Sequence, residues 1–133
     1  MNATTAFELY KKTRTSTAVE DASPHKLITM LLDGALERVA ISIGAMERKQ
    51  PALTGESISK AISIVDNLRV AVDHDAGGEI AGNLRDLYDY ITRRLLEANI
   101  MSDVSMLEEV SALLTEIKLA WNQVPKDLHS VTE

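Results

Sequence analysis

Histidines and the carboxylates beside them are the side chains in this sequence whose types and spacing could support chemistry. The chain holds three histidines, and one of them, His74, has Asp73, Asp75 and Glu79 close by. Three carboxylates and one imidazole could hold a divalent metal ion. An exposed acidic loop explains the same residues, because carboxylates also stabilise the N-terminus of a following helix. We favour the loop and expect no metal site and no cofactor.

Sequence patterns typical of enzymes are missing from the rest of the chain. There is no Glu-x-x-His pair, no H-E-x-x-H, no Walker loop and no G-x-S-x-G. The lack of Cys excludes disulfides, thiolate zinc sites and cysteine nucleophiles. Gly77-Gly78 is interpreted as a turn, since Gly readily adopts positive φ, and Glu108-Glu109 as exposed charge. The sequence therefore predicts a protein that is not an enzyme.

A histidine phosphotransfer domain is a remote alternative, because it is also a small acidic four-helix bundle. That chemistry needs an exposed histidine in the middle of a helix, flanked by groups that complement phosphate. His25 lies where a first helical turn is expected, and its neighbour Lys26 is the only useful cation there. The residues thus give this alternative little support.

The overall composition is that of an ordinary acidic globular domain. The 133 residues are 45% hydrophobic and 26% charged, and 14 Lys and Arg against 20 Asp and Glu give a net charge of −6. Nucleic acid and anionic membranes attract basic surfaces, so an acidic chain is poorly suited to either. No apolar run resembles a signal peptide or a membrane span. We expect one cytoplasmic domain without nucleic-acid partners or membrane insertion.

Apolar residues recur at three- and four-residue intervals through most of the chain, which is the spacing of one helix face. The periodicity predicts four helices, at residues 24–49, 56–72, 79–100 and 104–124. Connections this short cannot return the chain to the far end of a neighbour, so consecutive helices must be antiparallel. We predict an all-α fold, an antiparallel up-down four-helix bundle with a short N-terminal helical or extended segment.

The ends of the predicted helices are marked by capping and breaking residues. Ser23 and Pro24 are expected as the N-cap and first position of the first helix. Ser102 or Asp103 is expected to cap the fourth helix. Pro and Gly predict loops at residues 50–55 and 74–78. The chain then divides into an N-terminal segment and linker at 1–22, the bundle at 23–124 and a flexible tail at 125–133.

Two of the predicted helices carry more apolar residues than one core stripe needs. The fourth helix has a second apolar line at Met106, Val110, Leu113, Ile117, Ala120 and Val124. The first helix has a similar excess at Leu27, Leu31, Ile41 and Met46. These residues could fill the corners between helices, pack against a second copy in a homo-oligomer, or form a groove for an amphipathic partner helix. From the residues alone we predict a helical bundle that serves as a generic protein-binding or homo-oligomeric adaptor.

An ordered set of short motifs runs along nearly the whole chain, from Tyr10 to Trp121. The longest are Ser23-Pro24-His25-Lys26-Leu27-Ile28, Met30-Leu31-Leu32-Asp33-Gly34-Ala35-Leu36, Gly77-Gly78-Glu79-Ile80-Ala81 and Leu87-Tyr88-Asp89-Tyr90. In this order and spacing the motifs resemble the FliS family of flagellar export chaperones. Leu32 and Ile91 depart from the family pattern, which usually has an aromatic residue and a Met there, but both remain apolar.

The resemblance implies an antiparallel four-helix bundle and also a function. Family members bind the disordered C-terminal region of flagellin in the cytoplasm, prevent its premature polymerisation and assist its delivery to the flagellar type III export apparatus. The resemblance leaves open several further partners: an export-gate component, a co-chaperone, an anti-sigma factor, or a second copy of the free protein in a homodimer.

Position and resemblance together indicate which residues contact the partner. We expect these contacts at Phe7, Tyr10, Leu27, Leu31, Tyr90, Met106, Leu113, Ile117 and Ala120. By family precedent, the N-terminal segment folds over part of the client groove before flagellin binds, with residues 13–17 as its hinge. Trp121 and Tyr88 are expected in the core, and no catalytic residue is expected.

Overall fold

Four helices make up the described part of the chain, which comprises residues 23–75 and 79–124 of the computed structural model. They are α3 (Pro24–Glu47), α4 (Pro51–Asp75), α5 (Glu79–Met101) and α6 (Val104–Asn122). No strand occurs among these residues. The all-α prediction is therefore confirmed.

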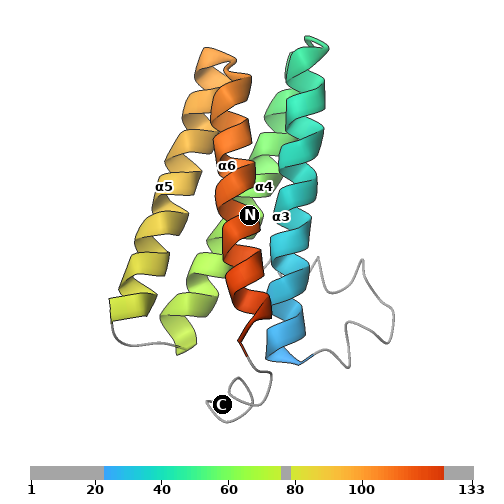
Figure 1. Cartoon of the computed structure of the whole chain (residues 1–133). Coiled ribbons are helices and arrows are strands. Elements are labelled where there is room, and N and C mark those ends of the chain that lie inside the picture. The colour runs from blue at the N-terminus through green and yellow to red at the C-terminus, as the bar shows by residue number, and fades with distance from the viewer. Residues whose placement is uncertain (1–22, 76–78, 125–133) are drawn as a thin grey trace.

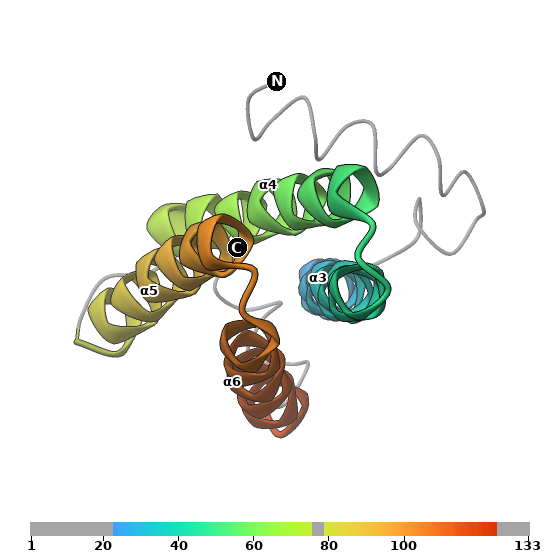
Figure 2. The same ribbon diagram turned by 90° about the horizontal axis from the view of Figure 1, so that it is seen from above.

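The helices pack in a ring in which each has two neighbours. α3 packs against α4 and α6, and α5 packs against the same two helices. Consecutive helices run in opposite directions, so the turns alternate between the two ends of an elongated bundle (Figure 1). Seen from above, α3 and α5 lie diagonally opposite each other (Figure 2). The packing is that of the predicted up-down bundle.

The loop predicted at residues 50–55 is wrong, because α4 already begins at Pro51. Pro lacks a backbone N–H and has a helical φ, so it fits the first position of a helix as well as a loop. The Thr54 N–H donates to the Gln50 carbonyl at 3.0 Å, and the Thr54 hydroxyl donates to the same oxygen at 2.9 Å. Gly55 is tolerated inside α4, where an added Cβ would lie 4.0 Å from the Asn99 side chain.

The second predicted break is also placed too early. α4 continues through Asp75, so His74 and Asp75 are helical, and only residues 76–78 separate α4 from α5. Gly77 and Gly78, which we interpreted as a turn, lie outside the described residues, as do residues 1–22 and 125–133. The other helix ends differ from the prediction by one or two residues, which is the usual fraying of such boundaries.

Both predicted caps are present. The Ser23 side chain accepts a hydrogen bond from the Lys26 N–H at 3.2 Å, at the start of α3. Asp103 caps α6 and accepts from the Ser105 N–H at 2.9 Å. The Ser105 hydroxyl also donates to the Asp103 carboxylate, and this hydrogen bond is the largest cause of the lowered pKa of that carboxyl. These caps satisfy N–H groups that a helix leaves unpaired at its N-terminus.

The two turns at one end of the bundle each contain a non-glycine residue in the left-handed region. Lys49 has a φ of 58° and Ser102 a φ of 50°. After α3, the Gln50 N–H donates to the Ala45 carbonyl and the Lys49 N–H to the Met46 carbonyl, which is the Schellman pattern. After α5, the Asp103 N–H donates to the Ala98 carbonyl in the corresponding way. Both turns therefore use the geometry that Gly adopts most easily.

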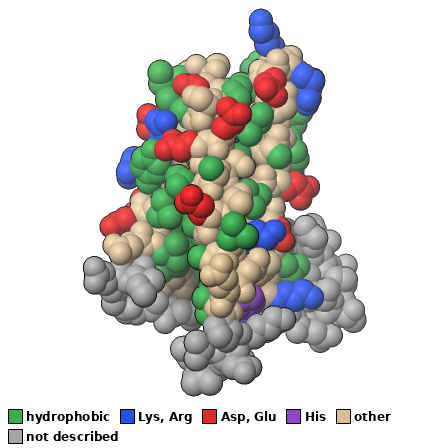
Figure 3. Space-filling view, viewed as in Figure 1, with side chains coloured by type: hydrophobic (Ala, Val, Ile, Leu, Met, Phe, Trp, Pro, Cys, Tyr) green, Lys and Arg blue, Asp and Glu red, His purple; other side chains and the backbone are tan. Residues whose placement is uncertain are grey.

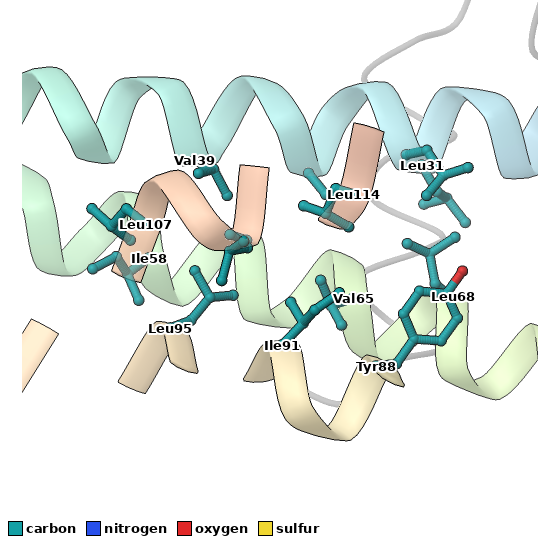
Figure 4. Packing of buried hydrophobic residues seen from close by; sticks show 14 of the residues in the cluster. Leu31, Val39, Ile58, Val65, Leu68, Tyr88, Ile91, Leu95, Leu107 and Leu114 are labelled. Carbon is teal, nitrogen blue, oxygen red and sulfur yellow. The ribbon is translucent and has the colours of Figure 1, made fainter. Parts of the chain in front are cut away.

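Each helix contributes one stripe of large apolar side chains to a single core. The residues labelled in Figure 4 converge between the ribbons, and they include Leu31, Val39, Ile58, Val65, Leu68, Tyr88, Ile91, Leu95, Leu107 and Leu114. Tyr88 is 2% exposed, so its predicted core position is confirmed. Burial raises the pKa of the Tyr88 hydroxyl well above its ordinary value.

His25 and Trp121 join the start of α3 to the end of α6. Their rings stack with centroids 4.9 Å apart and an interplanar angle of 17°. The Trp121 Nε1–H donates to the His25 carbonyl at 3.0 Å, and His25 Nε2 lies 3.3 Å from the Trp121 carbonyl. Trp121 also packs against the core cluster. Trp121, which we expected in the core, is therefore partly buried at its edge, with His25 as its partner.

Replacing Lys49 by Gly should stabilise the bundle by about 0.5–1 kcal/mol, because a side chain is disfavoured at positive φ and Gly is not. The free energy of unfolding would be measured in urea by far-UV circular dichroism. Arg48→Gly is the matched control, since Arg48 has an ordinary φ of −86°, and we expect it to lose stability. A loss of stability in Lys49→Gly as well would contradict the argument.

Candidate partner-binding site

The flank of α6 that faces α5 combines apolar residues with one carboxylate. Glu109 contacts α5, whereas Lys118 pairs with Asp33 of α3 at 2.6 Å, so the two flanks of α6 have different neighbours. Side chains three and four residues apart lie on the same side of a helix. Those on the side of Glu109 are Met106, Leu113, Ile117 and Ala120. We call these four residues and Glu109, together with Tyr90 and Arg94 of α5, the α5–α6 seam.

Polar contacts cross the seam at its centre. The Tyr90 hydroxyl donates to Glu109 Oε2 at 2.7 Å, and Arg94 Nε donates to Glu109 Oε1 at 2.7 Å. Arg94 also lies 3.6 Å from Glu97 on its own helix. The guanidinium carbons of Arg93 and Arg94 lie 5.8 and 5.9 Å from the centroid of the Tyr90 ring. The ring is therefore held at its hydroxyl and has two cations near it.

These contacts shift the ionisation of the groups that make them. The hydrogen bond from Tyr90, followed by that from Arg94, lowers the pKa of the Glu109 carboxyl. The same bond to Glu109 is the main reason that the pKa of the Tyr90 hydroxyl is raised, and it also raises the pKa of the Arg94 guanidinium. At neutral pH the seam thus holds an ionised carboxylate, a neutral phenol and a cation.

The structure brings five of the predicted contact residues together on this seam. Met106, Leu113 and Ile117 are partly buried and pack against the core cluster from its edge. Ala120 is exposed, and Tyr90 is partly buried. Figure 3 shows hydrophobic side chains between charged ones on the face that carries α5 and α6. The seam therefore presents apolar surface that a partner can reach.

The other predicted contact residues do not lie on the seam. Leu27 and Leu31 belong to α3, which is diagonal to α5 in the ring. Leu27 is partly buried, and Leu31 is 2% exposed within the core cluster. Phe7 and Tyr10 lie outside the described residues.

Glu109 and Arg94 are the seam residues that sequence reasoning missed. We interpreted Glu109 as ordinary exposed charge, yet it bonds to Tyr90 and Arg94. A signal was present in the spacing, because Glu109 lies three residues after Met106 and four before Leu113, on the same flank. Sequence alone does not indicate which helix this flank faces.

A second partly apolar surface lies at the end of the bundle that carries the two short turns. Ile100 is 82% exposed, Met101 62% and Leu96 50%, all near the end of α5. A shallow depression of ≈ 560 Å³ lies there, lined by Met46, Lys49, Gln50, Pro51, Thr54, Asn99, Ser102 and Val104. Sequence reasoning did not single out this surface, since its residues are spread over two turns.

The described residues contain little that could perform catalysis. His25 is 6% exposed, and its ring stacks on Trp121, so it is not the exposed mid-helix histidine that phosphotransfer requires. Within residues 23–75 and 79–124, no group of three or more His, Cys, Asp or Glu side chains is placed to hold a metal ion. In the same part of the chain, every helix is too short or too polar to cross a membrane.

Comparisons with known proteins agree on one family. A family model described as flagellar protein FliS matches residues 6–128. The flagellar secretion chaperone FliSB of Pseudomonas aeruginosa is 48% identical over 124 residues, which cover 93% of this chain and 98% of that protein. The flagellar secretion chaperone FliS of Salmonella typhimurium is 43% identical over 93% of both chains. The corresponding protein of Bacillus subtilis is 32% identical over 80% of this chain and 78% of its own.

Acidification should weaken the bundle partly through Glu109. Because its pKa is lowered in the folded state, the carboxylate stabilises the fold above its ordinary pKa, and this contribution is lost as the pH falls through the lowered value. Urea midpoints measured between about pH 6 and about pH 3.5 should fall less steeply in Glu109→Gln than in wild type. Glu108→Gln is the control, since Glu108 is exposed, and parallel curves for wild type and Glu109→Gln would contradict this assignment.

Proposed function

The chain belongs to the FliS family of flagellar proteins, and from this premise we propose that it binds the disordered C-terminal region of flagellin. Family membership makes it a flagellar export chaperone and not an enzyme. In our proposal it acts in the cytoplasm, prevents premature polymerisation of flagellin and assists its delivery to the flagellar type III export apparatus.

The observation that carries the proposal is the apolar flank of the α5–α6 seam. Met106, Leu113 and Ile117 pack against the core from its edge and keep part of their surface exposed. Their spacing along α6 is that of one helix face, so an amphipathic segment can lie beside them with its own apolar residues at similar intervals. A rigid bundle with such a flank suits a client that gains helix as it binds.

The energetics of a disordered client fit the task of an export chaperone. A segment that folds on binding loses conformational entropy, which reduces the affinity obtained from a given contact area. A wide contact surface is therefore compatible with release of the client at the export apparatus. The net charge of −6 also favours solubility in a protein that presents apolar surface.

A homodimer of the free protein is the competing use of the same surface. A stable protein interface buries about 800 Å² on each partner, whereas the seam offers three partly buried apolar side chains and one exposed alanine. A disordered segment can continue from the seam over neighbouring faces of the bundle, which a rigid second copy does less readily, and this favours a client. An export-gate component, a co-chaperone and an anti-sigma factor remain proposals that rest on the family resemblance alone.

The N-terminal segment has a proposed role as a cover for the client groove. Phe7, Leu9 and Tyr10 would pack on apolar surface until flagellin binds, with residues 13–17 as the hinge. Deleting residues 1–13 should then change the affinity for flagellin and increase cleavage of the bundle by proteases. Unchanged affinity together with unchanged protease sensitivity would rule out this cover.

Titration with a peptide from the C-terminal region of a flagellin tests the function directly. We expect saturable one-to-one binding in calorimetry, a negative heat-capacity change and a gain of helix beyond the sum of the parts in far-UV circular dichroism. Ala120→Glu should weaken this binding about tenfold or more, because a charge would have to be buried beside the apolar flank.

Thr115→Glu is the control, since Thr115 is also exposed on α6 but lies on a different side of the helix, three or four positions from none of the seam residues. It should bind the peptide as wild type does. A folded wild-type bundle that gives neither heat nor added helix would contradict the chaperone proposal. Equal effects of the two substitutions would indicate that the client binds another face of the bundle. Light scattering at several concentrations would detect a homodimer.

A further inference from the structure

A single carboxylate of α6 orders two side chains of α5 at the centre of the seam. Each oxygen of Glu109 has its own donor, with Tyr90 on Oε2 and Arg94 on Oε1, both at 2.7 Å. Tyr90 and Arg94 are four residues apart, so they project from the same side of α5 and reach one acceptor. The position of Glu109 on α6 therefore determines where both side chains lie.

Stability alone is a weak explanation for this arrangement. The side chains of Arg94 and Glu109 remain 25% and 38% exposed, and ion pairs in contact with solvent contribute little to folding. The Arg69–Asp89 pair between α4 and α5 has the same 2.7 Å distance and similar exposure. What distinguishes the Glu109 cluster is that it also holds an aromatic ring at the edge of an apolar flank.

Aromatic side chains held in one orientation are efficient anchors for a partner. Tyr and Arg are enriched among the residues that contribute most to protein interfaces. A side chain that is ordered before binding loses little conformational entropy on contact. Tyr90 meets this condition, because Glu109 binds its hydroxyl and the Arg93 and Arg94 guanidinium carbons lie within 5.9 Å of its ring centroid.

We propose that Glu109 is a positioning residue for client recognition, which holds the Tyr90 ring and the Arg94 stem as a preformed edge of the α5–α6 seam. An aliphatic side chain of the client packs against this edge. The inference rests on the proposed function, since the client is the flagellin segment. It also defines the chemistry of the contact: the charge of Arg94 is already met by Glu109 and Glu97 within the chain, so the seam selects an apolar group here.

A double-mutant cycle on client binding tests the proposal. Tyr90→Phe keeps the ring but loses the hydroxyl bond, and Glu109→Ala removes its acceptor. Each should weaken binding of the flagellin peptide about 3- to 10-fold, the value of one hydrogen bond. The double variant should bind about as well as Glu109→Ala alone, because both changes break the same bond. Additive losses, or unchanged affinity in Glu109→Ala, would overturn the proposal.

Asp89→Ala is the matched control for a carboxylate that ties two helices without holding an aromatic ring. Asp89 accepts from Arg69 Nε at 2.7 Å, and its loss should change peptide affinity less than twofold. Far-UV circular dichroism would establish that every variant is folded. An equal loss of affinity in Asp89→Ala and Glu109→Ala would mean that both act through the bundle as a whole, against a positioning role.

A measurement on the free protein separates this inference from the proposed function. Aromatic ¹³C relaxation of Tyr90 should report an ordered ring in wild type and a mobile ring in Glu109→Ala. If wild type binds no flagellin peptide, the proposed function fails. If the Tyr90 ring is nevertheless ordered in wild type and mobile in Glu109→Ala, the result would still support positioning for another client. A Tyr90 ring that is equally mobile in both proteins would overturn it.

Discussion

Burial of one apolar stripe from each helix in a common core is the constraint on which the rest of this structure depends. Leu32, Val39, Ile91, Leu95 and Leu107 are all 0% exposed. Since each helix turns one face inward and packs against two neighbours, every helix also has two flanks at the edges of the core. The flanks are where polar side chains can meet across helices and where apolar residues can stay within reach of a partner.

Polar contacts on these flanks join neighbouring helices. Lys118 pairs with Asp33 across α6 and α3, and Arg69 pairs with Asp89 across α4 and α5. Glu109 connects α6 to α5. Because all these side chains are partly exposed, the contacts add little stability, and their main effect is on the positions of the side chains that make them. At the end of the bundle opposite the two short turns, the stacked rings of His25 and Trp121 connect α3 to α6.

The separation of a stabilising core from partly exposed flanks suits a chaperone of flagellar export. The core supplies stability, so the flanks are not all needed for folding and one of them can serve a client. The α5–α6 seam carries the apolar residues Met106, Leu113 and Ile117 beside the ordered Tyr90. Binding by such a surface requires no reactive group, in keeping with a family whose members are secretion chaperones.

The sequence alone specifies the four helices, their antiparallel order, the cap at Ser23 and the buried position of Tyr88, and it narrows the cap of α6 to Ser102 or Asp103, because periodicity and capping are local. It misplaced the start of α4, since Pro51 suits a loop and a first helical turn equally. The tertiary structure alone shows which flank faces which neighbour. It separated Leu27 and Leu31 from the seam, joined Glu109 to Tyr90 and paired His25 with Trp121, because contacts between distant segments depend on how whole helices rotate and pack.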